Sequence, residues 1–210
     1  MNMLFLTIPL IFIFFITMGF GYYITKKEKD STFSFFTHFP FEIKSKNDKL
    51  LILFRALLVI VAGLCAFISL YSLYVEGNYI LEKNLALLMV LNSILLVALF
   101  MIDTRKYKVH LVTSILFMLF NLGISFLVLY LPIRDNFVNY HLVTLILGVI
   151  IFVLQLVLTL LPSLKHWYVM EVDEAGNKSR GKVFPLALVE WIHILSFLSI
   201  FIILLINSLI

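Results

Sequence analysis

The stretch ALLVIVAGLCAFISLYSLYV, residues 56–75, contains twenty consecutive residues without a charge. A helix of about twenty residues is long enough to cross the hydrocarbon core of a bilayer, which is about 30 Å thick. Five further uncharged stretches of similar or greater length occupy residues 1–25, 84–102, 109–133, 136–164 and 191–210. We therefore predict an all-α membrane protein, a bundle of six transmembrane helices at about 4–24, 52–74, 85–102, 109–131, 142–162 and 186–207.

The composition supports this class of protein. Hydrophobic residues make up 62% of the 210-residue chain and charged residues only 13%, too few to cover the surface of a soluble domain. The two-residue alternation of a membrane barrel is missing from the sequence. No basic residue precedes the first apolar stretch and no small-residue cleavage site follows it, so we expect a retained helix rather than a signal peptide. We expect residues 1–210 to form a single integral membrane domain.

The basic residues predict the orientation. Fourteen of the sixteen Lys and Arg residues flank three connections, those between the first and second, third and fourth, and fifth and sixth predicted helices. The other two, Lys83 and Arg134, lie in the remaining loops. By the positive-inside rule, both termini lie outside and the basic loops are cytoplasmic. The net charge of +4 follows from this topology, so we predict no nucleic-acid partner.

Two of these connections have a distinctive pattern. The first contains FSFFTHFPFEI, residues 33–43, between the lysine-rich runs KKEKD and KSKNDK. Aromatic rings flanked by lysines suit the headgroup boundary of an anionic leaflet, so this segment is either a docking surface for lipid or a partner, or a membrane-lying connector. The candidate docking residues are Phe33, Phe35, Phe36, His38, Phe39 and Phe41. Residues 167–183 alternate polar and apolar residues around AGN, which predicts either a small hairpin or a solvated connector.

Polar residues within the predicted helices form stripes at helical spacing. Three of these stripes are His110, Ser114, Asn121 and Ser125; His141, Thr144, Gly148, Gln155 and Thr159; and Glu190, His193, Ser196 and Ser199. We expect these stripes to face one another, because small and polar residues favour close helix contacts in lipid. Asn92, Asn121 and Gln155 form a candidate midplane layer that either binds a ligand or joins the helices by hydrogen bonds. No charge lies near the midplane, which disfavours a coupled pump but not a passive permease.

Two charges lie within apolar stretches. Arg55 and Glu190 each lie about five residues, or roughly 7 Å, inside the cytoplasmic start of their helices. Equal depth and opposite sign predict an ion pair, and the alternative is that each side chain extends separately to the interface.

The sequence predicts no catalytic residue, metal centre or cofactor. Glu190 and His193 have the spacing of a helical metal-binding motif, but only one copy occurs and no other carboxylate lies within a predicted membrane helix. Cys65 is the only cysteine, so no disulfide can form within the chain, and it has no evident catalytic base.

We therefore expect a multipass protein of a bacterial cytoplasmic membrane. Its bacterial origin is inferred from its small size, short loops and heavy use of Phe, Ile, Leu and Lys. The leading function is a non-catalytic interaction within the bilayer, as an accessory or immunity-type protein whose partners are lipid, another membrane protein or a second copy. The alternatives are a passive permease for a small solute or lipid, and a lipid-modifying enzyme at the inner interface.

Overall fold

A computed structural model describes residues 3–28, 33–77, 79–102, 107–160, 171–172, 178–179 and 184–210. Within these residues, six helices are long and apolar enough to cross a membrane, which confirms the six-helix bundle. The spanning elements are α1 (Thr7–Glu28, preceded by the 3-10 helix Met3–Leu6), α2 (Asp48–Ser69, continued by a π-helix at Leu70–Val75), α3 (Ile80–Met101), α4 (Tyr107–Arg134), α5 (Leu142–Leu160) and α7 (Pro185–Leu209).

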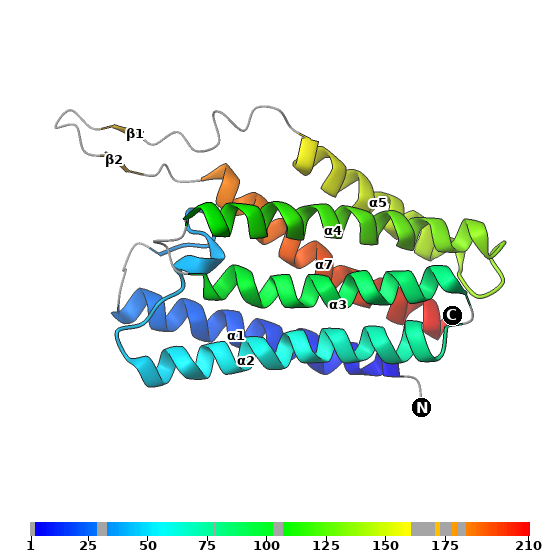
Figure 1. Cartoon of the computed structure of the whole chain (residues 1–210), viewed down its shortest axis with the longest axis horizontal. Coiled ribbons are helices and arrows are strands. Elements are labelled where there is room, and N and C mark those ends of the chain that lie inside the picture. The colour runs from blue at the N-terminus through cyan, green and yellow to red at the C-terminus, as the bar shows by residue number, and fades with distance from the viewer. Residues whose placement is uncertain are drawn as a thin grey trace.

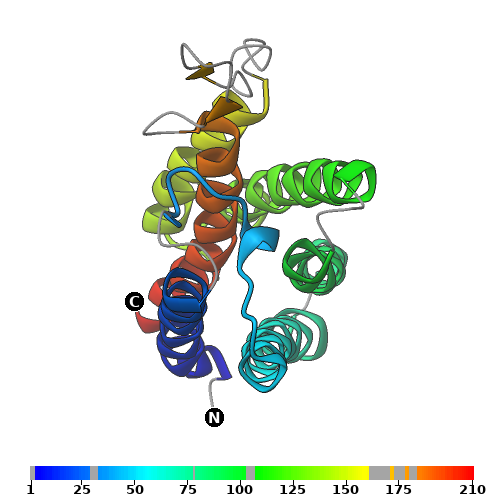
Figure 2. The same ribbon diagram turned by 90° about the vertical axis from the view of Figure 1, so that its left-hand side faces the viewer.

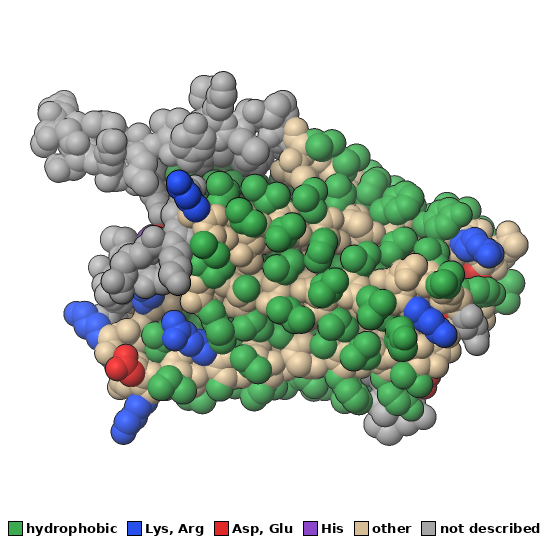
Figure 3. All heavy atoms as spheres, in the orientation of Figure 1, with side chains coloured by type: hydrophobic (Ala, Val, Ile, Leu, Met, Phe, Trp, Pro, Cys, Tyr) green, Lys and Arg blue, Asp and Glu red, His purple; other side chains and the backbone are tan. Residues whose placement is uncertain are grey.

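The helices run alternately up and down, so the bundle has two distinct ends. The end with the C-termini of α1, α3 and α5 and the N-termini of α2, α4 and α7 lies at the left of Figure 1. We call it the inner end, because it carries the three basic connections. The chain termini lie at the opposite, outer end. Between the two ends, hydrophobic side chains cover the face of the bundle in Figure 3, and Lys and Arg side chains lie at its margins.

Helix α7 is the central element of the bundle. Helices α1 to α5 pack in chain order, each against the next, and α7 packs against α5, α4 and α1. In the most apolar window of each helix, 72% of the residues are buried in α7 and only 17% in α5. The polar residues of α7 are thus surrounded by protein rather than lipid. Figure 2 shows α7 in orange and red between α5 in yellow and α1 in blue.

The helix boundaries differ from the predicted ones by a few residues, for identifiable reasons. Helix α3 begins at Ile80 rather than near residue 85, because the Glu82 carboxylate accepts the backbone N–H of Tyr79 at 2.9 Å and caps the first turn. Helix α4 continues through Pro132 to Arg134, three residues beyond the predicted end at residue 131. Helix α7 begins at Pro185, which suits the first turn because a backbone N–H there has no partner within the helix.

Part of the predicted hairpin is present. Strand β1 (Glu171–Val172) pairs antiparallel with β2 (Lys178–Ser179), and Glu171 lies opposite Ser179. The remaining residues of 167–183 lie outside the described part of the chain.

Polar contacts hold the outer end together. The Tyr140 hydroxyl donates to Glu82 Oε1 at 2.7 Å, which joins the start of α5 to the start of α3. Burial raises the pKa of the Tyr140 phenol, and the neighbouring Glu82 carboxylate raises it further. Asn207 near the end of α7 accepts the backbone N–H of His141 at 2.8 Å and the Thr144 hydroxyl at 2.6 Å.

Candidate functional site

A buried cluster of ionisable and hydroxyl side chains lies at the inner end, between α4 and α7. Glu190 of α7 is only 3% exposed. Its Oε1 atom lies 3.1 Å from Nε2 of His110 and accepts the Ser114 hydroxyl at 2.7 Å. His110 and Ser114 lie one turn apart on α4, so both reach the same carboxylate oxygen. A carboxylate within an apolar bundle requires such donors, because an unpaired buried charge is very costly.

Several polar atoms of this region remain without a hydrogen-bond partner in the described structure. They are Oε2 of Glu190, Nδ1 of His110, and both ring nitrogens of His193. His193 lies one turn further along α7 and is completely buried. Buried polar atoms of native proteins usually have a partner, so this concentration marks the inner half of α7 as a candidate functional site.

The predicted pairing of Arg55 with Glu190 is not formed. Arg55 is exposed on α2, whereas Glu190 is enclosed, and His110 and Ser114 take the place expected of the arginine. Arg55 lies seven residues after the start of α2 and Glu190 five residues after the start of α7, but a position along a helix does not determine which helix is the neighbour. Helix α7 packs against α4, α5 and α1, and its contact with α4 brings His110 beside Glu190. The exposed position of Arg55 agrees with the alternative, in which its side chain extends separately to the interface.

The structure brings together two of the three residues of the predicted midplane layer. Asn92 of α3 donates from Nδ2 to Oδ1 of Asn121 at 3.0 Å, and Asn121 donates to the backbone carbonyl of His193 at 2.7 Å. Gln155 of α5 instead accepts the hydroxyl of Ser125, one turn further along α4, at 3.0 Å. All three amide side chains are completely buried. These contacts join α3, α4, α5 and α7, and a role for the layer in ligand binding stays a prediction.

The aromatic segment of the first connection, which we call the cap segment (residues 33–43), folds onto the inner end of the bundle. Figure 2 views this end and shows the segment in light blue crossing between the helices. Phe33, Phe39 and Phe41 are buried, and the Phe41 ring lies 4.0 Å from the ring of His110. Of the six predicted docking residues, Phe36 alone is largely exposed, with 58% of its surface accessible. Most of these rings therefore contact protein, where they cover aromatic and histidine side chains at the inner ends of the helices.

Two hydrogen bonds to its backbone carbonyls attach the cap segment to α7 and to Phe184, the residue that precedes α7. The Trp191 indole N–H donates to the carbonyl of His38 at 2.8 Å, and the N–H of Phe184 donates to the carbonyl of Phe36 at 2.8 Å. The Phe35 ring meets the Trp191 ring edge to face, with centroids 4.8 Å apart. The cap segment therefore covers the Glu190 cluster, and Trp191, the residue after Glu190, holds the segment in place.

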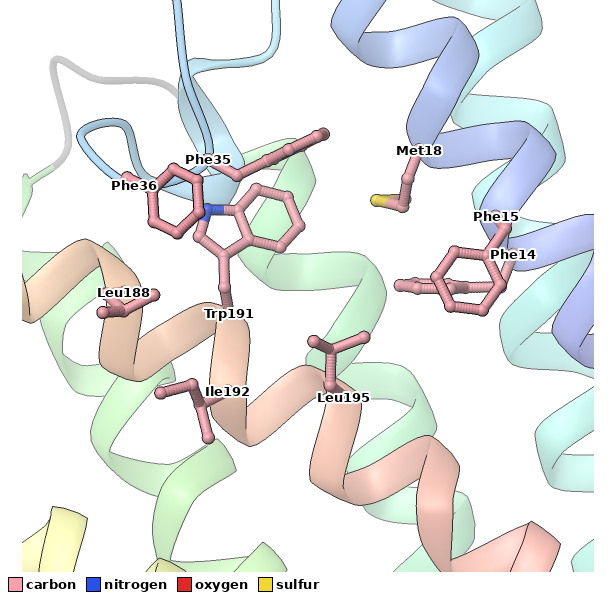
Figure 4. A pocket seen from close by; sticks show the side chains of 9 residues that line it. All are labelled: Phe14, Phe15, Met18, Phe35, Phe36, Leu188, Trp191, Ile192 and Leu195. Carbon is pink, nitrogen blue, oxygen red and sulfur yellow. The ribbon is translucent and has the colours of Figure 1, made fainter. Parts of the chain in front are cut away.

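An apolar cavity of about 250 Å³ lies beside this cluster, on the other side of α7. Figure 4 shows its lining side chains, which come from α1, the cap segment and α7. They are Phe14, Phe15, Met18, Phe35, Phe36, Leu188, Trp191, Ile192 and Leu195. Phe15, Phe36 and Leu195 are also exposed, so the cavity opens sideways on the surface that faces lipid.

The chemistry of the two sites differs. In the Glu190 cluster, the Ser114 hydroxyl donates to the carboxylate and not to an imidazole, so the arrangement differs from a Ser-His-Asp triad. Cys65 is completely buried. Among the described residues, no group of three or more His, Cys, Asp or Glu side chains is arranged to hold a metal ion. The lateral cavity offers only apolar contacts and is suited to an apolar ligand.

The sequence places His110, Ser114 and His193 on polar stripes, but no spacing marks the three as one site. The available signal was the depth of His110, which is close to that of Glu190. The sequence carries no comparable signal for the lateral cavity, because apolar residues like those of its lining occur throughout the predicted helices.

The fold defines this chain as a multipass, six-helix membrane protein. No protein family, curated protein or solved structure matches it.

Proposed function

We propose that this protein acts within the bilayer by binding and not by catalysis, as an accessory or immunity-type protein that holds an apolar molecule in the lateral cavity. The observation that carries this proposal is the position of the cavity between α1 and α7, open to the membrane and lined by apolar side chains. Pockets with such linings select ligands by apolar contact, and here those ligands must already reside in the membrane. The membrane we propose is a bacterial cytoplasmic membrane, on the grounds of composition and size.

The inner polar cluster supports the same assignment. One carboxylate oxygen of Glu190 is engaged by His110 and Ser114, and aromatic rings of the cap segment cover the histidine. A substrate would have to displace this segment to reach the carboxylate. We therefore assign the cluster to positioning α7 and the cap segment, which together form two walls of the cavity.

Site-specific photo-crosslinking tests the proposal. A photo-reactive amino acid replaces Ile192, which lines the cavity, or Ile150, a matched control that is 57% exposed on α5. We expect a discrete adduct from position 192 in native membranes and only diffuse lipid labelling from position 150. The adduct should weaken when Leu195→Phe fills the cavity. The same labelling pattern from both positions would overturn the proposal.

A second function, a lipid-modifying enzyme at the inner interface, is favoured by the unpartnered atoms of Glu190 and the two histidines. Under this alternative, Glu190→Gln abolishes turnover of a membrane lipid while the protein remains folded. Under the binding proposal, the same substitution leaves the adduct from position 192 in place. Lipid extracts and crosslinking from one pair of membrane preparations separate the two functions.

A further inference from the structure

The lateral cavity is bounded by α1, by α7 and, toward the inner end, by the cap segment. Phe14, Phe15 and Met18 of α1 form one wall, and Ile192 and Leu195 of α7 form the other. The cap segment and the first turns of α7 form the part nearest the inner end, where Phe36 and Leu188 lie. The Phe35 and Trp191 rings meet edge to face beside them. An elongated apolar group could therefore lie along the helices between α1 and α7, with the end nearer the inner end of the bundle against the aromatic rings.

Two basic side chains lie in the last turn of α1, between the cavity and the inner end of the bundle. The Phe35 ring contacts the Tyr22 ring at 5.4 Å, and the Tyr22 hydroxyl accepts a hydrogen bond from the Lys26 ammonium at 2.7 Å. Lys27, the next residue, donates to the Tyr23 hydroxyl at 2.9 Å. The side chains of Lys26 and Lys27 are both exposed.

The depth of these lysines matches the layers of a membrane leaflet. Lys26 lies eight residues beyond Met18, or about 12 Å along the helix. The headgroup layer on each side of a bilayer is roughly 5–8 Å thick. A phosphate held at Lys26 would therefore place the attached acyl chain at the level of Met18 and the other apolar lining residues.

From this combination we propose that the cavity binds one acyl chain of an anionic glycerophospholipid of the inner leaflet, with the lipid phosphate at Lys26 and Lys27. This inference rests on the proposed function and names its ligand class. The cavity supplies no polar partner for a headgroup, whereas the lysines above it do. An ammonium group has three N–H donors, so Lys26 can keep its bond to Tyr22 and still donate to a phosphate oxygen.

Fluorescence quenching by brominated lipids tests this inference on the full-length protein in vesicles. Trp167→Phe leaves Trp191 as the only tryptophan, and Trp191, which lines the cavity, is only 6% exposed. The vesicles contain equal amounts of phosphatidylglycerol and phosphatidylcholine, with bromine on the acyl chains of one or the other. We expect brominated phosphatidylglycerol to bind with a preference of at least about fivefold, the factor that a single lysine near an anionic surface supplies.

Matched variants separate the contributions. Lys26→Gln with Lys27→Gln should remove the preference, whereas Lys46→Gln with Lys49→Gln, an equal loss of exposed charge before and within α2, should retain it. Leu195→Phe should reduce quenching by both lipids, and it should fold normally because Leu195 is 44% exposed. Equal quenching by the two lipids, or undiminished quenching in Leu195→Phe, would overturn the lipid assignment. A discrete protein adduct from position 192 would then still support the proposed function.

Discussion

Glu190 shows how a single charged residue is accommodated inside this bundle. Its Oε1 atom has two donors, His110 and Ser114, while its Oε2 atom has no partner in the described structure. Removing a donor from a buried carboxylate leaves that carboxylate without compensation, which typically costs more than the contact itself contributes. The carboxylate and the imidazole should therefore depend on each other energetically.

A double-mutant cycle measures this dependence. We expect Glu190→Ala to lower the free energy of unfolding by about 3 kcal/mol. The coupling energy between Glu190→Ala and His110→Ala should be about 1–3 kcal/mol, whereas Glu190→Ala and Arg55→Ala should be additive within about 0.5 kcal/mol. Unfolding of the purified protein by denaturing detergent gives these values. Coupling to Arg55 instead of His110 would contradict the contacts seen here.

Sequence analysis could identify Glu190 as unusual but could not identify its partner. A residue's depth follows from its distance to the helix end, and this reasoning placed Arg55 and Glu190 at the same level. His110 lies at a similar level, so depth alone allowed either partner. The choice depends on which helices are neighbours, and that depends on packing across the whole bundle.

At the scale of the element, α4 and α5 approach each other closely at Gly148. A Cβ atom at Gly148 would lie 2.9 Å from the Cα atom of Leu129, so only glycine permits this approach. The approach positions Gln155, two turns further along α5, to accept the Ser125 hydroxyl. Small residues at helix interfaces allow such contacts in membranes, where no hydrophobic force drives helices together.

We expect Gly148→Ala to force α4 and α5 apart and to lower the free energy of unfolding by about 1–3 kcal/mol. Gly123→Ala on α4 is the control, because a Cβ atom there meets nothing within 4 Å. That variant should be neutral or up to about 1 kcal/mol more stable, since alanine favours helix formation. Thermal unfolding in detergent checks both variants, and equal melting temperatures would refute the close approach.

The helices themselves were predictable because each is encoded by a continuous local feature, about twenty apolar residues between polar ends. The cap segment was not, although its composition was conspicuous. Aromatic residues flanked by lysines suit both the headgroup layer and a protein surface, and here Phe33, Phe39 and Phe41 are buried against protein. Only the arrangement of the surrounding helix ends distinguishes the two, and this arrangement is not a local property.

At the scale of the whole molecule, the two ends of the bundle differ in character. The outer end is joined by direct hydrogen bonds such as those of Glu82 and Asn207. The inner end holds the Glu190 cluster, the cap segment that covers it and the lateral cavity. The proposed lipid site belongs to the cytoplasmic leaflet only if the inner end faces the cytoplasm, as the distribution of Lys and Arg predicts.

Cysteine accessibility in intact cells tests this orientation most directly. In a Cys65→Ala background, single cysteines replace Lys46 before α2 at the inner end and Val138, 74% exposed, after α4 at the outer end. We predict that a membrane-impermeant maleimide labels Val138→Cys in intact cells and labels Lys46→Cys only after the membrane is opened. Labelling of Lys46→Cys in intact cells, with Val138→Cys protected, would contradict the orientation and the inner-leaflet site together.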